Sequence, residues 1–235
     1  MQAVLDTIQN IGVFLAFLAA RFAVLLVVLA ALAVVFLAGL AVVRLAGLAR
    51  RRALGLTRVE GLVWRPGVFF SPGHAWLQTR EGGALRVGLD DLAQHVLARI
   101  SEVILPSPGQ LVRAGEPAAI VRAGKRRAAI PAPVTGRVVS INRRVAANPI
   151  RMHSDPYGGG WLYAVQPEDT SFTKLPQGDE SRAWFSGEAV RLSQFFEHQL
   201  GMAAADGGEL IAPAPSLLTE SQWEEMTQSF LQASK

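Results

Sequence analysis

The feature that most constrains this chain is an apolar run near its N-terminus. Residues 22–43 hold twenty-two consecutive residues without a charged side chain. As an α-helix, a run of this length extends about 33 Å, enough to cross a hydrocarbon core of about 30 Å. A cleaved signal peptide would begin with a basic region, whereas residues 1–10 contain Asp6 and neither Lys nor Arg. The run therefore predicts a single membrane-spanning helix.

Basic residues flank this span unequally. Arg44 and the arginines at 50–52 follow it, while only Arg21 lies just before it. Because Lys and Arg concentrate on the cytoplasmic side of a span, the sequence predicts a single-pass protein of the plasma (inner) membrane with a cytoplasmic C-terminal domain. Residues 1–52 are then a membrane anchor with a basic stop, and membrane lipid is a predicted partner.

The charge of the chain is divided between two regions. Residues 1–168 hold nineteen Lys or Arg and nine Asp or Glu, a net charge of +10, whereas residues 169–235 hold four and ten, a net charge of −6. Part of the basic excess follows the span, where it indicates topology, so we predict no nucleic-acid partner. There is no cysteine, and the four histidines lack the spacing of metal ligands. We therefore predict no metal site, and no residue pattern predicts a catalytic group.

Beyond the anchor, composition divides the chain into three segments. Glycine and proline residues in 53–69 predict a linker. Residues 70–168 contain many short strand-like runs separated by turn signals, which is typical of a small antiparallel barrel or sandwich. Residues 169–235 predict an acidic helical C-terminal extension, whose last helix opens at a capping box formed by Thr219 and Gln222.

Five motifs in the middle segment occur in the order and with the spacing of a known family. They are Gly-His-Ala-Trp-Leu at 73–77, Val-Gly-Leu-Asp-Asp-Leu-Ala-Gln at 87–94, Leu-Pro…Gly…Val-Arg-Ala-Gly-Glu-Pro at 105–117, Ala-Pro-Val-Thr-Gly at 132–136 and Asp-Pro-Tyr-Gly-Gly-Gly-Trp-Leu at 155–162. On these motifs, residues 70–168 resemble the lipoyl-carrying H-protein of the glycine cleavage system. The resemblance implies a mostly-β lipoyl domain with a barrel-sandwich fold, between the transmembrane α-helix and the helical tail.

The resemblance also implies a modification site. Family members carry lipoate on a lysine at a hairpin tip, and counting back from the motif at 132–136 places this lysine at Lys125. The surrounding sequence departs from the usual Glu-Ser-Val-Lys-Ala, because Arg122 replaces the acid and Arg126 follows the lysine. The implied cofactor is lipoate, linked covalently to Lys125. The implied partners are a lipoate-attaching enzyme and the enzymes that depend on the carrier.

Two functions of different classes follow. The first is a membrane-tethered, non-enzymatic carrier that moves a one-carbon (aminomethyl) group or reducing equivalents between partner enzymes. The second is an unmodified scaffold or assembly subunit of a membrane complex. In that case Arg122, Arg126 and Arg127 would bind the acidic extension, an acidic partner or lipid headgroups. The position of Lys125 favours the carrier, and the arginine-rich hairpin favours the scaffold.

Overall fold

The computed structural model describes residues 1–201 and 215–232, and the chain forms two compact units, Met1–Ala53 and Leu54–Lys235. The first unit is a single helix, α1 (Gln2–Ala53). Its section Gly12–Ala49 reaches a mean hydropathy of 3.1 and buries none of that apolar surface against other parts of the chain. By length and composition, this helix is able to cross a membrane.

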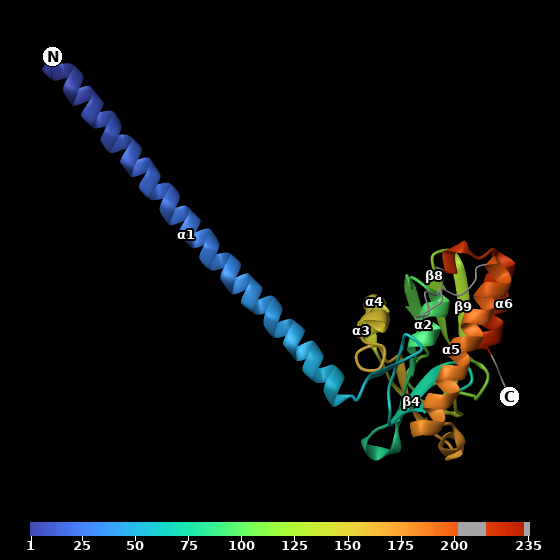
Figure 1. Cartoon of the computed structure of the whole chain (residues 1–235). Coiled ribbons are helices and arrows are strands. Elements are labelled where there is room, and N and C mark those ends of the chain that lie inside the picture. The colour runs from blue at the N-terminus through green and yellow to red at the C-terminus, as the bar shows by residue number, and fades with distance from the viewer. Residues whose placement is uncertain (202–214, 233–235) are drawn as a thin grey trace. The chain divides into compact units, whose positions relative to one another are not determined.

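The described residues of the second unit, which we call the H domain, form three sheets in which neighbouring strands are antiparallel (Figure 1). One sheet has six strands in the order β3-β4-β5-β11-β10-β7, another has the order β6-β8-β9, and the third is the hairpin β1-β2. The strands are β1 (Thr57–Val59), β2 (Leu62–Trp64), β3 (Phe69–Phe70), β4 (Ala75–Thr79), β5 (Leu85–Leu89), β6 (Glu102–Ile104), β7 (Leu111–Val112), β8 (Pro117–Ala123), β9 (Arg126–Pro131), β10 (Gly136–Ile141) and β11 (Tyr163–Pro167).

Five α-helices accompany these sheets in the described part of the domain. They are α2 (Asp91–Leu97), α3 (Arg143–Ala147), α4 (Ile150–Ser154), α5 (Gly178–Leu200) and α6 (Glu220–Leu231), with short 3-10 turns η1 (Glu81–Gly83), η2 (Ser171–Lys174) and η3 (Pro215–Leu217). The capping box predicted at the start of α6 is present: Thr219 accepts from the backbone of Gln222, and the Gln222 side chain accepts from the backbone of Thr219. These bonds satisfy N–H groups that have no partner within the helix.

A tight contact between β4 and β5 explains part of the sequence pattern. Trp76 is fully buried, and its Nε1 donates to the carbonyl oxygens of Leu89 at 3.1 Å and Pro156 at 3.2 Å. Gly88 lies opposite Trp76 in the strand register. A Cβ at Gly88 would lie 2.5 Å from the indole ring, so only glycine leaves room for it.

The prediction of a linker at 53–69 was wrong for residues 57–64. Strands β1 and β2 form a hairpin in this segment, and Val59, Leu62 and Trp64 are buried in the core. The turn consists of Glu60 and Gly61, which both have positive φ, of 48° and 78°. Two such residues are typical of a type I′ hairpin turn, so the glycine marks a tight reversal and not a flexible connection.

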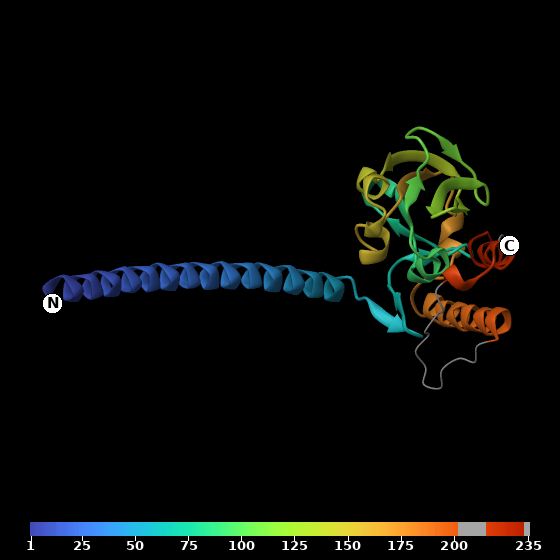
Figure 2. The same cartoon turned by 90° about the horizontal axis from the view of Figure 1, so that it is seen from above.

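Helices α5 and α6 pack against the same core as the strands. They lie side by side in both views (Figures 1 and 2) and are linked by a 2.9 Å hydrogen bond from Gln199 to Glu225. Helix α6 contacts α2 and β9, and α5 contacts β1 and β2. Phe185 and Phe196 of α5 are buried, as is Phe230 of α6. The two helices are therefore structural parts of the H domain.

Candidate functional site

The predicted site residue Lys125 lies at the tip of the β8–β9 hairpin. Ala123 pairs with Arg126 in the strand register, which leaves Gly124 and Lys125 as a two-residue turn. Gly124 has a φ of +66°, and Lys125 is not among the residues with positive φ. A type II′ hairpin turn has this pattern, with glycine at its first central position. Lys125 is exposed, and within the described residues its side chain makes no hydrogen bond or ion pair.

The choice of lysine at this turn is informative in an arginine-rich chain. Only three lysines, at 125, 174 and 235, stand among the 23 basic residues. A guanidinium group stays protonated at any physiological pH, whereas a lysine amine can lose a proton and attack an activated acyl group. Position 125 therefore carries an amine able to form an amide, placed where an enzyme can reach it.

The three arginines predicted as one basic patch lie on two faces of the hairpin. Arg122 and Arg127 are opposite each other in the register and are both exposed. Side chains alternate between the faces of a strand, so Arg126 shares the opposite face with the buried Ala128. Arg122 lies 3.1 Å from the carboxylate of Glu102 on β6, whereas Arg127 has no ion pair within the described residues.

Arg126 binds the C-terminal part of the chain instead of facing solvent. Its guanidinium donates to the carbonyl oxygen of Pro215 at 2.8 Å, to that of Leu218, and to the carboxylate of Glu220 at 3.2 Å. It also lies over the indole ring of Trp223, 5.6 Å from the ring centroid. This arrangement agrees with the hypothesis that the acidic extension contacts the basic tip. Among the three arginines, Arg126 makes this contact.

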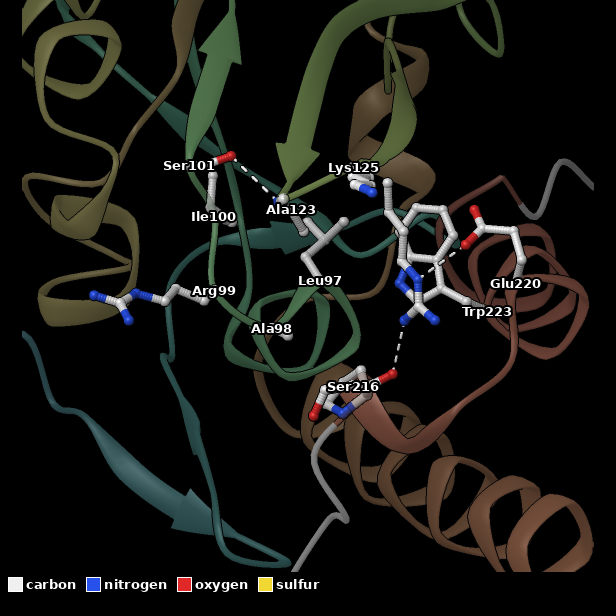
Figure 3. Close-up of a pocket in the computed structure, with 13 residues that line it drawn as sticks. Leu97, Ala98, Arg99, Ile100, Ser101, Ala123, Lys125, Ser216, Glu220 and Trp223 are labelled. Carbon is white, nitrogen blue, oxygen red and sulfur yellow. Dashed lines mark hydrogen bonds and ion pairs between the residues drawn. The ribbon is translucent and has the colours of Figure 1, made fainter.

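A cavity of about 580 Å³ lies between the hairpin and the C-terminal segment (Figure 3). Lys125, Glu220 and Trp223 are among the residues that line it. Leu97 and Ile100, from the end of α2 and the loop after it, contribute apolar surface. The surroundings of Lys125 are therefore built by the hairpin, the α2–β6 loop and α6 together.

His74, from the first of the five motifs, lies in a buried charge network. Its Nδ1 lies 2.8 Å from Asp90, the N-cap of α2, and its Nε2 lies 3.3 Å from Glu188 on α5. Burial alone would lower the pKa of His74, but the charges and hydrogen bonds of Asp90 and Glu188 outweigh it and raise the pKa to about 9. The protonated imidazole therefore joins the first motif to α2 and α5.

Comparison with known proteins agrees with this geometry. Residues 68–185 match the model of the glycine cleavage H-protein family. The chain is 36% identical over 111 residues to the glycine cleavage system H protein of Psychrobacter sp. (strain PRwf-1), a match that covers 47% of this chain and 88% of that protein. It is 33% identical over 122 residues to the H protein of Coprothermobacter proteolyticus, covering 52% and 96%. The chain belongs to the glycine cleavage H-protein family.

Among solved structures, the H protein from Mycobacterium marinum matches with a TM-score of 0.47 at 30% identity, over 53% of this chain and 99% of that one. H-proteins carry lipoate on a lysine and act as carriers between partner enzymes, not as catalysts. In the present chain, α1 and α6 both lie outside residues 68–185, the part that matches the family model.

The sequence did not indicate that Glu220 and Trp223 would lie beside Lys125. About ninety residues separate them from the hairpin, and no motif links the two segments. The alternation of side chains along a strand gave one indication. Arg126 is two and four residues before Ala128 and Ile130, so it lies on the same, inward face of β9 as these two buried residues. An inward-facing arginine requires a partner, and α6 provides it.

Proposed function

We propose that the protein is a membrane-tethered lipoyl carrier and that Lys125 is the residue that holds the lipoyl group. The observation that carries this proposal is the position of Lys125, an exposed amine at a two-residue turn of an H-protein-family domain. It moves a one-carbon (aminomethyl) group or reducing equivalents between partner enzymes at the cytoplasmic face of the plasma (inner) membrane.

The residues of the hairpin suit this attachment. Gly124 adopts a positive φ at no steric cost, so the turn needs only two residues and Lys125 stands at its end. The Nζ of Lys125 attacks the carboxyl carbon of lipoate, which the attaching enzyme supplies as an activated acyl group. The amide bond forms, the bond to the activating group breaks and that group leaves, and the amine loses a proton. When bound, the lipoyl group supplies a reducible disulfide on a long flexible chain. Within the described residues, no side chain forms a hydrogen bond or ion pair with the Lys125 amine that would compete with this reaction.

Helix α1 supports the tethering part of the proposal. Its apolar section is long enough to span a bilayer, and the arginines that follow favour a cytoplasmic H domain. A tether raises the effective concentration of a carrier for partners on the same membrane. The partners we expect are therefore a lipoate-attaching enzyme and carrier-dependent enzymes associated with a membrane complex.

Intact-mass measurement tests the proposal. The H domain, residues 54–235, forms a compact unit with its own core, so it is co-expressed with a lipoate-attaching enzyme and lipoate. We expect a mass increase of one lipoyl group, lost in Lys125→Arg and retained in Lys174→Arg. Absence of the group, under conditions in which a typical H-protein is modified, would contradict the carrier and favour the unmodified scaffold.

A further inference from the structure

Helix α6 is a fixed neighbour of the modification hairpin. It begins 35 residues after the matched segment ends at residue 185. Trp223, Met226, Phe230 and Leu231 are all buried against the rest of the H domain. Detaching α6 would expose four large apolar side chains to water, which is strongly unfavourable. The helix therefore acts as part of the domain surface and not as a lid.

A protein that acts on Lys125 must also meet the first turn of α6. A typical stable interface covers about 800 Å² on each partner, which corresponds to a disc of about 16 Å radius. Lys125 and Glu220 line the same cavity, and the carboxylate of Glu220 accepts a 3.2 Å hydrogen bond from Arg126, which directly follows Lys125 in the chain. The first turn of α6 therefore falls within the surface that such a partner covers.

The charges of the hairpin make this neighbour significant. No acidic residue occurs between Glu116 and Asp155, whereas eight basic residues do. Negative charge near the tip must come from other elements. Glu102 on β6 is paired with Arg122, and Glu220 on α6 is paired with Arg126 but remains 63% exposed.

Glu224 extends this negative charge along the helix. It is exposed and lies four residues after Glu220, so the two carboxylates share one face of α6. No hydrogen bond or ion pair of the Glu224 side chain occurs within the described residues.

We propose that Glu220 and Glu224 form a recognition element for the enzyme that acts on Lys125, and that this enzyme presents basic groups to the first turn of α6. The inference rests on the proposed carrier function and adds the partner's surface chemistry to it. Complementary charges at an interface accelerate encounter and select among partners. The same turn would disfavour an enzyme with an acidic surface there.

The test uses the full-length chain in lipid nanodiscs, with a purified lipoate-attaching enzyme, lipoate and ATP as the probe. The initial rate of lipoyl transfer is measured for the wild type, Glu224→Lys and the double variant Glu220→Lys/Glu224→Lys. Glu168→Lys is the matched control, because Glu168 is also exposed but lies away from the hairpin tip. Its backbone N–H donates to the carbonyl oxygen of Thr135, which follows the end of β9 that is farthest from the tip.

We expect Glu224→Lys to lower kcat/KM by about fivefold, mainly through a higher KM, with a larger loss in the double variant. The difference from wild type should shrink as ionic strength rises from about 50 to about 300 mM, because exposed charges are screened. A purely structural defect would not depend on salt in this way. Circular dichroism checks that each variant is folded.

The outcomes separate the two proposals. If the wild type is modified and the α6 variants match Glu168→Lys, the recognition element is refuted while the carrier function stands. A faster reaction in Glu224→Lys would also refute it, since α6 would then repel the enzyme. If no chain is modified while a typical H-protein is, both the carrier function and the recognition element fail.

Discussion

Because of the buried His74 network, we expect the free energy of unfolding of the H domain to fall as the pH becomes alkaline. The pKa of His74 is raised from 6.5 to about 9 in the folded domain, because Asp90 and Glu188 outweigh the effect of burial. A group whose pKa is raised on folding adds stability that is complete below the unfolded pKa and is lost as pH rises through the folded one. Between about pH 7.5 and about pH 9.5, linkage gives a loss of about 2 kcal/mol in the free energy of unfolding.

Urea unfolding of residues 54–235 at these two pH values measures this loss. His74→Gln should lower stability at the lower pH and should remove most of the pH dependence, since glutamine does not titrate. His198→Gln is the matched control, because no hydrogen bond or ion pair of His198 occurs within the described residues. A wild-type difference below about 0.5 kcal/mol, or an equal pH dependence in His74→Gln, would refute the account of a protonated buried imidazole.

Three further predictions concern packing and topology. Trp76→Ala should lower the free energy of unfolding of the H domain by about 3–5 kcal/mol, because the ring is fully buried; a loss below about 0.5 kcal/mol in urea titration would contradict this packing. Gly88→Ala should cost about 1–3 kcal/mol, because its Cβ would overlap the Trp76 ring, and an unchanged midpoint would refute the contact. A reporter fused after Lys235 should be active only in its cytoplasmic form; periplasmic activity would overturn the orientation.

Local signals in the sequence predicted much of the fold correctly. The predicted capping box of Thr219 and Gln222 falls at the start of α6, because these side chains satisfy the first N–H groups of a helix. The H-protein motifs placed Lys125 at a hairpin tip, where the structure has it. These features depend on residues close together in the chain, which is why sequence patterns reveal them.

Features that depend on contacts between distant segments were not predictable in the same way. The hairpin β1–β2 looked like a linker because glycine occurs both in flexible segments and in tight turns, and only the burial of Leu62 and Trp64 distinguishes them. The pairing of Arg126 with Glu220 joins residues 94 positions apart, and nothing in either local sequence specifies the other. Three arginines close in sequence therefore looked like one patch, although strand geometry separates them.

The central claim is that a membrane-anchored chain carries lipoate on Lys125. It is tested most directly by isolating the full-length protein from the membrane fraction of cells that have a lipoate-attaching pathway, and mapping its lysines by tandem mass spectrometry. The account predicts a lipoyl group on the peptide that contains Lys125, on no other lysine, and in protein that detergent but not high salt releases from the membrane. An unmodified Lys125, or a soluble full-length protein, would contradict it.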